Sequence, residues 1–268
     1  MIMRGLFHSL SVSFFCGVLL LSSVSSSSAS DDGSPPVVSS SSRPWKKVLT
    51  PILAKVTGQK VLQQGYLDFG RKPQPETICV VYQSAYLRRT DFGGAKAMLQ
   101  LSRKANADLR RLRSVLPPGF VAFIGTNRFL HSGWSRKGQG LEEVQIARLE
   151  LAAGPGTSQF DIVKLAGTEP VNYDMSTADV IEGLRAVDRY VGINISQACF
   201  DTLTFSLRKT AADKDKLARL ILKVCPELHP AYCPDAFPDA KPSRVDMRNY
   251  EAFVRSLEKG TEIVLWWD

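Results

Sequence analysis

The sequence predicts an α+β fold whose last third forms a sheet covered by helices. Three features support this: short segments of alternating apolar and polar residues, segments with apolar residues three and four positions apart, and glycines between them. The predicted order is strand, helix, strand, strand, helix, extra helix, strand, which is the split βαβ order of ferredoxin-like folds. We therefore expect a C-terminal ferredoxin-like sheet domain at 157–268, preceded by a smaller α+β region at 45–156.

The first two C-terminal elements are a predicted strand and a predicted helix. Phe160–Ala166 is short and mostly apolar and is followed by Gly167, which predicts a strand. A helix should begin at Ser176 or Thr177, with Asp179 close enough to complete an N-terminal cap. The buried stripe expected on this helix consists of Val180, Ile181, Leu184, Val187 and Val191.

The remaining C-terminal elements follow the same two patterns. The sequence predicts strands at 193–196, 202–207 and 263–267, and helical stripes at 217–224 and 250–257. In the last strand Trp267 shares its face with Ile263 and Leu265, so it is expected in the core. Trp266 should then lie on the opposite face with Val264, either packed or lining a binding surface.

The N-terminus is predicted to direct export. Residues 1–30 combine the basic Arg4, an apolar run at Phe14–Leu21 and small residues at Ser28–Ser30, which is typical of a cleaved signal peptide. The alternative is an uncleaved anchor. Residues 31–44 are rich in Ser and Pro and are expected to form a disordered linker. We expect a secreted or periplasmic protein, because no later run is apolar enough to form a transmembrane segment.

The region 45–156 shows a second set of α+β patterns. It is predicted to contain strands at Ile78–Tyr82, Phe120–Ile124 and Val144–Leu151, and a helix at Asp91–Leu116. Arg128–Gly140 is polar and glycine-rich, which predicts an exposed loop. The net charge of +8 permits contact with an anionic partner. The basic segment 88–113 is expected to be a solvated helix face, since interleaved aromatics and a nucleic-acid-binding module are both missing.

Four cysteines follow the predicted signal peptide, an even number that permits disulfides in an exported chain. Cys225 and Cys233 lie eight positions apart in a proline-rich segment, so we predict a disulfide between them. A weaker alternative is a zinc site formed by Cys225, His229 and Cys233, which would need a fourth ligand. Cys79 lies in an apolar strand and is expected to be a buried small side chain.

Six short motifs resemble one uncharacterised bacterial family. They are Gln159–Ala166, Asn172–Met175, Thr177–Ile181, Asp201–Phe205, Tyr232–Asp235 and Leu265–Asp268. In this order they are similar to the domain of unknown function number four-two-five-three. The family pattern continues after Cys-Pro-Asp with Ile-Val-Asp-Gln-Gly, whereas Asp235 is followed here by Ala236–Ala240. The resemblance implies a fold and no activity.

Several polar residues and one tryptophan lie where the predicted strands and helices end. This candidate ligand or polar site consists of Asn172, Asp174, Asp201, Cys233, Asp235, Trp266 and Asp268. Asn and Asp often cap helices and tighten turns, and converging carboxylates would instead suit a cation or acid–base chemistry.

The sequence contains no motif for nucleotide binding, a serine nucleophile or a zinc peptidase, so no cofactor is expected and no catalytic residue is assigned. We expect a non-catalytic exported protein that binds an unknown protein or a small molecule. The alternative is a hydrolase or a metal-dependent enzyme that uses Cys233 and Asp235.

Overall fold

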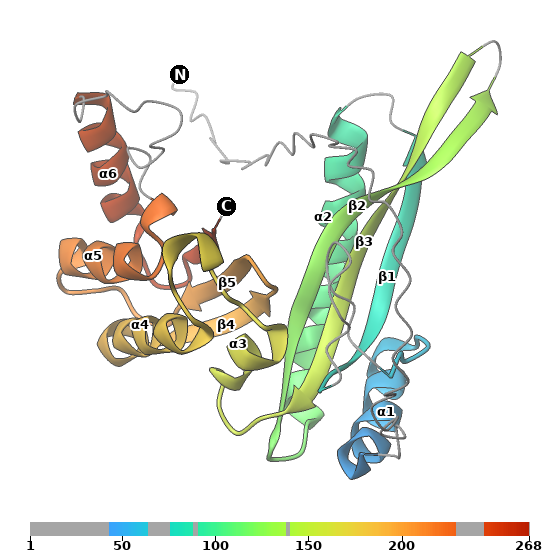
Figure 1. Cartoon of the computed structure of the whole chain (residues 1–268), viewed down its shortest axis with the longest axis horizontal. Coiled ribbons are helices and arrows are strands. Elements are labelled where there is room, and N and C mark those ends of the chain that lie inside the picture. Colours follow the sequence, from blue (N-terminus) through green and yellow to red (C-terminus); the bar gives the residue numbers. More distant parts are fainter. Residues whose placement is uncertain (1–42, 64–75, 88–90, 138–139, 229–243, 268) are drawn as a thin grey trace, which may run out of the picture. The chain divides into compact units, whose positions relative to one another are not determined.

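The computed structural model describes residues 43–63, 76–87, 91–137, 140–228 and 244–267, and one six-stranded sheet runs through them (Figure 1). Its strands are β1 (Ile78–Leu87), β2 (Phe120–Lys137), β3 (Gly140–Pro155), β4 (Ile193–Ala198), β5 (Thr202–Leu207) and β6 (Glu262–Trp266). They lie in the order β1-β3-β2-β4-β5-β6. All neighbours are antiparallel except β2 and β4, which are parallel. The predicted α+β class is therefore confirmed.

The helices lie outside the sheet. They are α1 (Pro44–Thr57), α2 (Asp91–Val115), α3 (Asp161–Ala166), α4 (Thr177–Val191), α5 (Lys214–Val224) and α6 (Arg244–Ser256), with short 3₁₀ turns η1 (Val171–Tyr173) and η2 (Pro226–Leu228). None of these helices is both long enough and apolar enough to cross a membrane. The signal peptide and linker predicted at 1–30 and 31–44 lie before the described residues, apart from the start of α1.

Two hydrophobic cores stabilise the sheet, one on each face. The core beneath α1 and α2 includes Leu49, Leu53, Ile78, Val80, Leu109, Leu112, Leu149 and Leu151. The second core packs α3, α4 and α5 on β4, β5 and β6, and it also contains Cys79, Phe123 and Ala152 from the neighbouring residues of β1, β2 and β3. Because alternate residues of a strand point to opposite faces, these three N-terminal strands are buried on both sides where they meet the second core.

The C-terminal helices and strands agree closely with their sequence patterns. Ser176 caps α4, and both hydrogen bonds of the capping box with Asp179 are present. All five residues of the predicted α4 stripe are buried. Gly192 follows α4 with a φ of 69°, a left-handed value that favours glycine and explains why the helix ends there.

The predicted strand at Phe160–Ala166 is wrong, because Asp161–Ala166 is the helix α3. Ile162, Leu165 and Ala166 are three and four positions apart and are all buried, which is helical spacing. A strand would have placed Lys164 on the same face as Ile162. The Asp161 carboxylate also accepts hydrogen bonds from the backbone N–H groups of residues 157 and 158, both at 3.0 Å, which fixes the turn before the helix.

The ferredoxin-like split βαβ arrangement is not confirmed. With 160–166 helical, the C-terminal region contributes three strands, and β6 pairs with β5. The loop predicted at Arg128–Gly140 is also wrong, because β2 continues to Lys137 and β3 begins at Gly140. The two strands pair from Phe120 and Pro155 out to Lys137 and Gly140, so backbone pairing along a long hairpin overrides the polar composition.

The parallel junction between β2 and β4, which we call the seam, depends on side chains. Between the described residues of these strands only Ile124 and Gln197 are paired. The Gln159 amide donates to the Ile193 carbonyl at 3.2 Å and accepts from the Ile195 N–H at 3.0 Å. It therefore occupies the place that a neighbouring peptide group would take along β4.

Arg113 of α2 completes the seam. Its guanidinium donates to the carbonyls of Ala122 in β2 and Ile195 in β4, and to Oδ1 of Asn194 at 3.1 Å. Burial lowers the pKa of Arg113 to about 10, so the group stays charged at neutral pH. One partly buried cation thus ties a helix to both strands of the seam.

Candidate functional site

The face of β4, β5 and β6 opposite the second core carries polar residues and two exposed apolar side chains. We call this surface the open face; it consists of Asn194, Ser196, Thr202, Thr204, Ser206, Glu262, Val264 and Trp266. Residues along β6 are exposed and buried in strict alternation. Val264 is 50% exposed and Trp266 is 42% exposed, whereas Ile263 and Leu265 are buried. The predicted placement of Trp266 opposite Trp267 is therefore correct.

Val264 and Trp266 form a short apolar strip bordered by hydroxyl groups. They are two positions apart on one face, which places their side chains next to each other along β6. In the register with β5, Val264 lies opposite Thr204 and Trp266 opposite Thr202. Thr204 is buried, so the strip combines an exposed aromatic ring with the partly exposed Thr202 on the neighbouring strand, an arrangement that suits binding more than chemistry.

The β4–β5 turn at one end of the open face contains Asp201 and Cys199. Asp201 Oδ1 accepts hydrogen bonds from Cys199 Sγ at 3.3 Å and from Thr202 Oγ1 at 3.1 Å, and its carbonyl accepts from the Trp267 N–H at 2.9 Å. Burial, together with the negative charge of Asp201, raises the pKa of Cys199 to about 12. The thiol therefore stays protonated at neutral pH and donates its hydrogen to Asp201.

Sequence reasoning did not identify the pair of Cys199 and Asp201. The signal that could have revealed it is a cysteine two positions before an aspartate, in a turn between two alternating strands. Such a turn closes tightly enough for the two side chains to meet.

Asn172 and Asp174 lie elsewhere, in and just after η1. Both are exposed, and Asp174 has a φ of 52°, a left-handed conformation that Asp tolerates in turns. Within the described residues no three His, Cys, Asp or Glu side chains are grouped so that they could hold a metal ion. Asp174 and Asp201 therefore do not belong to a common cluster of acidic ligands in this part of the chain.

Four predicted site residues cannot be placed: His229, Cys233, Asp235 and Asp268 lie outside the described residues. Cys225 is buried, and its Sγ donates to the carbonyl of Trp266 at 3.2 Å. No disulfide joins any two of the cysteines at 79, 199 and 225. The Cys225–Cys233 disulfide, the zinc alternative and the enzyme alternative stay predictions.

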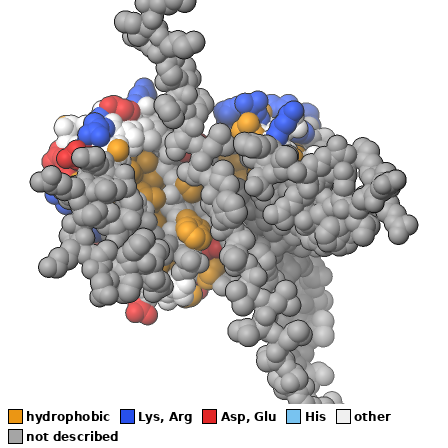
Figure 2. All heavy atoms as spheres, turned by 90° about the horizontal axis from the view of Figure 1, so that it is seen from above, with side chains coloured by type: hydrophobic (Ala, Val, Ile, Leu, Met, Phe, Trp, Pro, Cys, Tyr) orange, Lys and Arg blue, Asp and Glu red, His pale blue; other side chains and the backbone are white. Residues whose placement is uncertain are grey.

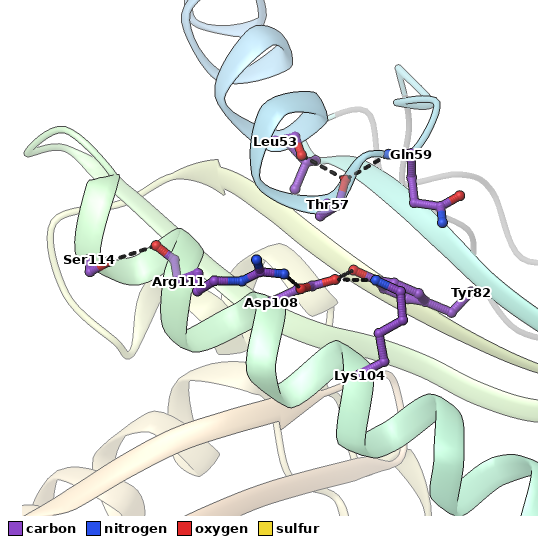
Figure 3. Close-up of polar contacts among 8 residues, drawn as sticks. All are labelled: Leu53, Thr57, Gln59, Tyr82, Lys104, Asp108, Arg111 and Ser114. Carbon is purple, nitrogen blue, oxygen red and sulfur yellow. Dashed lines mark hydrogen bonds and ion pairs between the residues drawn. The ribbon is translucent and has the colours of Figure 1, made fainter.

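A second polar cluster lies under α2 (Figure 3). Asp108 is only 1% exposed and accepts hydrogen bonds from the Tyr82 hydroxyl at 2.7 Å, from Lys104 at 3.0 Å and from Arg111. Burial favours the neutral acid, but these hydrogen bonds outweigh it and hold the pKa of Asp108 below its usual value. Burial and the hydrogen bond to Asp108 raise the pKa of Tyr82. The Asp108 carboxylate is therefore ionised at neutral pH and holds Lys104 and Arg111 on the outside of α2.

Comparison with known proteins identifies the C-terminal part of the chain. The model of the family described as Domain of unknown function (DUF4253) matches residues 150–268. The match begins within β3 and includes the open face and the β4–β5 turn. No curated protein and no solved structure is significantly similar to the chain. Residues 150–268 therefore match the DUF4253 family, and the resemblance of the C-terminal motifs to this domain is confirmed.

Proposed function

We propose that this protein is an exported, non-catalytic binding protein that holds an apolar part of a partner on the open face. The observation that carries the proposal is the exposure of Val264 and Trp266 side by side on β6, on a face whose other residues are polar. Apolar side chains that are contiguous and exposed on a polar surface mark interaction sites more often than single exposed residues do.

The chemistry of the open face supports binding. Tryptophan is enriched among the residues that dominate binding energy, because a large flat ring buries much area with few rotatable bonds. The hydroxyls of Thr202 and Ser206 lie on the neighbouring strand of the same face, where they can orient a partner through hydrogen bonds. The strip is also fixed, since Trp267 on the other face is buried and its Nε1 donates to the Val224 carbonyl at 3.0 Å.

The non-catalytic part of the proposal draws on the β4–β5 turn. Its thiol has a raised pKa, and its carboxylate already accepts two side-chain hydrogen bonds. A nucleophile would need a lowered pKa or an adjacent base. Export is inferred from residues 1–30, which have the charge and apolar pattern of a signal peptide.

The binding proposal is tested with three immobilised forms of the mature protein: wild type, Trp266→Ala and Val48→Ala. Val48 lies on α1 and is 44% exposed, so it is a matched control for removing an exposed apolar side chain. The three immobilised proteins are incubated with periplasmic extract or culture medium of the native host. The wild type and V48A should both retain the same partner. We expect W266A to bind it roughly tenfold more weakly or worse, as expected for a hot-spot residue.

Equal retention by all three forms would contradict the binding proposal. The intact mass of the endogenous protein purified from the native host checks export, because an exported chain should have lost roughly its first 30 residues. A full-length chain confined to the cytoplasm would contradict that part alone.

A further inference from the structure

The outer surface of α2 carries five exposed cations. We call this the basic surface; it consists of Lys96, Arg103, Lys104, Arg110 and Arg111. Among the residues from 96 to 115 the only carboxylate is Asp108, which is buried beneath the helix. Figure 2 shows Lys and Arg side chains gathered on one part of the described surface, apart from the region where basic and acidic side chains are mixed.

The cations form two rows along the helix. Lys96, Arg103 and Arg110 are seven positions apart, which is close to two helical turns, so they lie on one line about 21 Å long. Lys104 and Arg111, which are also seven positions apart, form the second row beside the first. Ala107 and Ser114 lie between the lines, where their small side chains leave room for a ligand that runs along the helix.

The second row is held in place from below. Lys104 and Arg111 both contact the Asp108 carboxylate, and the Lys104 ammonium also lies 5.2 Å from the centre of the Tyr82 ring. Their side chains remain largely exposed, at 48% and 64%. Because these cations are ordered before any ligand arrives, less conformational entropy is lost when one binds.

We propose that the basic surface binds an acidic polypeptide segment in an extended form along α2. Glu or Asp side chains at alternate positions of an extended segment all point to one side of the strand, and that side would face the two rows of cations. This interaction surface uses residues separate from the open face and goes beyond the proposed function.

Two other anionic partners fit the surface less well. Binders of single-stranded nucleic acid stack bases on aromatic side chains, and none of the exposed residues of α2 between 96 and 115 is aromatic. A helix that lies in a lipid surface inserts its apolar face, but the apolar face of α2 is occupied, since Ala105, Leu109 and Leu112 pack in the core.

The probe is a fluorescently labelled peptide of alternating Glu and Ser, about ten residues long, which is longer than the row of cations when extended. Its binding to the whole mature chain, which lacks only the predicted signal peptide, is followed by fluorescence anisotropy. We expect saturable binding that weakens as salt is added, because the cations are exposed and are screened by ions.

The double variant Arg103→Gln/Arg110→Gln should weaken peptide binding roughly five- to tenfold, as expected for two exposed charge pairs. The matched control Arg189→Gln/Lys209→Gln removes two exposed cations elsewhere and should change the affinity by less than about twofold. Thermal melting of both variants checks that the substitutions leave the fold unchanged.

Three outcomes would overturn the inference: no binding by the wild type, equal weakening by the two double variants, or tighter binding of single-stranded DNA or of anionic phosphatidylglycerol vesicles than of the peptide. The variant Trp266→Ala should bind the peptide normally. A loss of peptide binding therefore leaves the proposal for the open face untouched.

Discussion

The two halves of the sheet use the same hydrogen-bonded framework in different ways. β1, β3 and β2 have 10, 16 and 18 residues, and next to the second core they are covered on both faces. β4, β5 and β6 have only 6, 6 and 5 residues, and one of their faces exposes Val264 and Trp266. The N-terminal half is therefore covered on both faces beside the second core, whereas the C-terminal half leaves two large apolar side chains of one face exposed.

Among the described residues, the two halves of the sheet are joined by backbone pairing only at the seam. Within each half, neighbouring strands pair over five or more residues, whereas one pair joins the described parts of β2 and β4. Arg113 and Gln159 supply hydrogen bonds that a regular ladder would have provided. Buried carbonyls and N–H groups must be paired, so these two side chains are expected to affect stability strongly.

A large loss of stability is expected from breaking the seam with Arg113→Met. This variant keeps an unbranched side chain but leaves the buried carbonyls of Ala122 and Ile195 without their donor, which should lower the free energy of unfolding by about 2–4 kcal/mol. Urea unfolding of the full chain gives the value.

Arg110→Met on the same helix is the control for the seam experiment. Arg110 is exposed on the basic surface, so its replacement should cost less than about 0.5 kcal/mol. If the two variants were equally stable, the side chains would not be holding the halves together.

A smaller effect, on the reactivity of Cys199, is expected from a substitution in the β4–β5 turn. The charge of Asp201 helps to raise the pKa of Cys199, so Asp201→Asn should lower that pKa and increase the thiolate fraction at a given pH. The rate of alkylation of Cys199 near pH 8 should then rise severalfold, measured by peptide mapping with iodoacetamide. An unchanged rate would show that Asp201 does not control the thiol.

Most of the C-terminal half could be predicted from sequence because its strands and helices each have one apolar face and one polar face. Apolar and polar residues alternate in β5 and β6, and the α4 stripe and its cap are local patterns, so each element carries its own signal. The prediction that Trp266 and Trp267 lie on opposite faces followed from that alternation alone.

The sequence-based predictions were wrong or incomplete mainly where contacts between distant residues determine the structure. The outer part of the β2–β3 hairpin is polar, and pairing between distant residues makes it a strand. The seam depends on Arg113 meeting residues about 80 positions away, which no local pattern reveals. The six residues 161–166 are mostly apolar and suited a strand or a helix. Lys164 lies two positions after Ile162 and would share its buried face in a strand, which was the signal that favoured the helix.

The most direct test of the account compares Trp266→Ala with Trp267→Ala by urea unfolding. The two residues are neighbours of the same type at the end of β6, and they differ in the face they occupy. W267A removes a buried ring and its hydrogen bond to Val224, so it should lose about 3–5 kcal/mol of unfolding free energy. W266A should lose about 1 kcal/mol or less, because that ring is on the open face. Equal, large losses for both variants would mean that Trp266 serves the fold, and would contradict a binding surface on the open face.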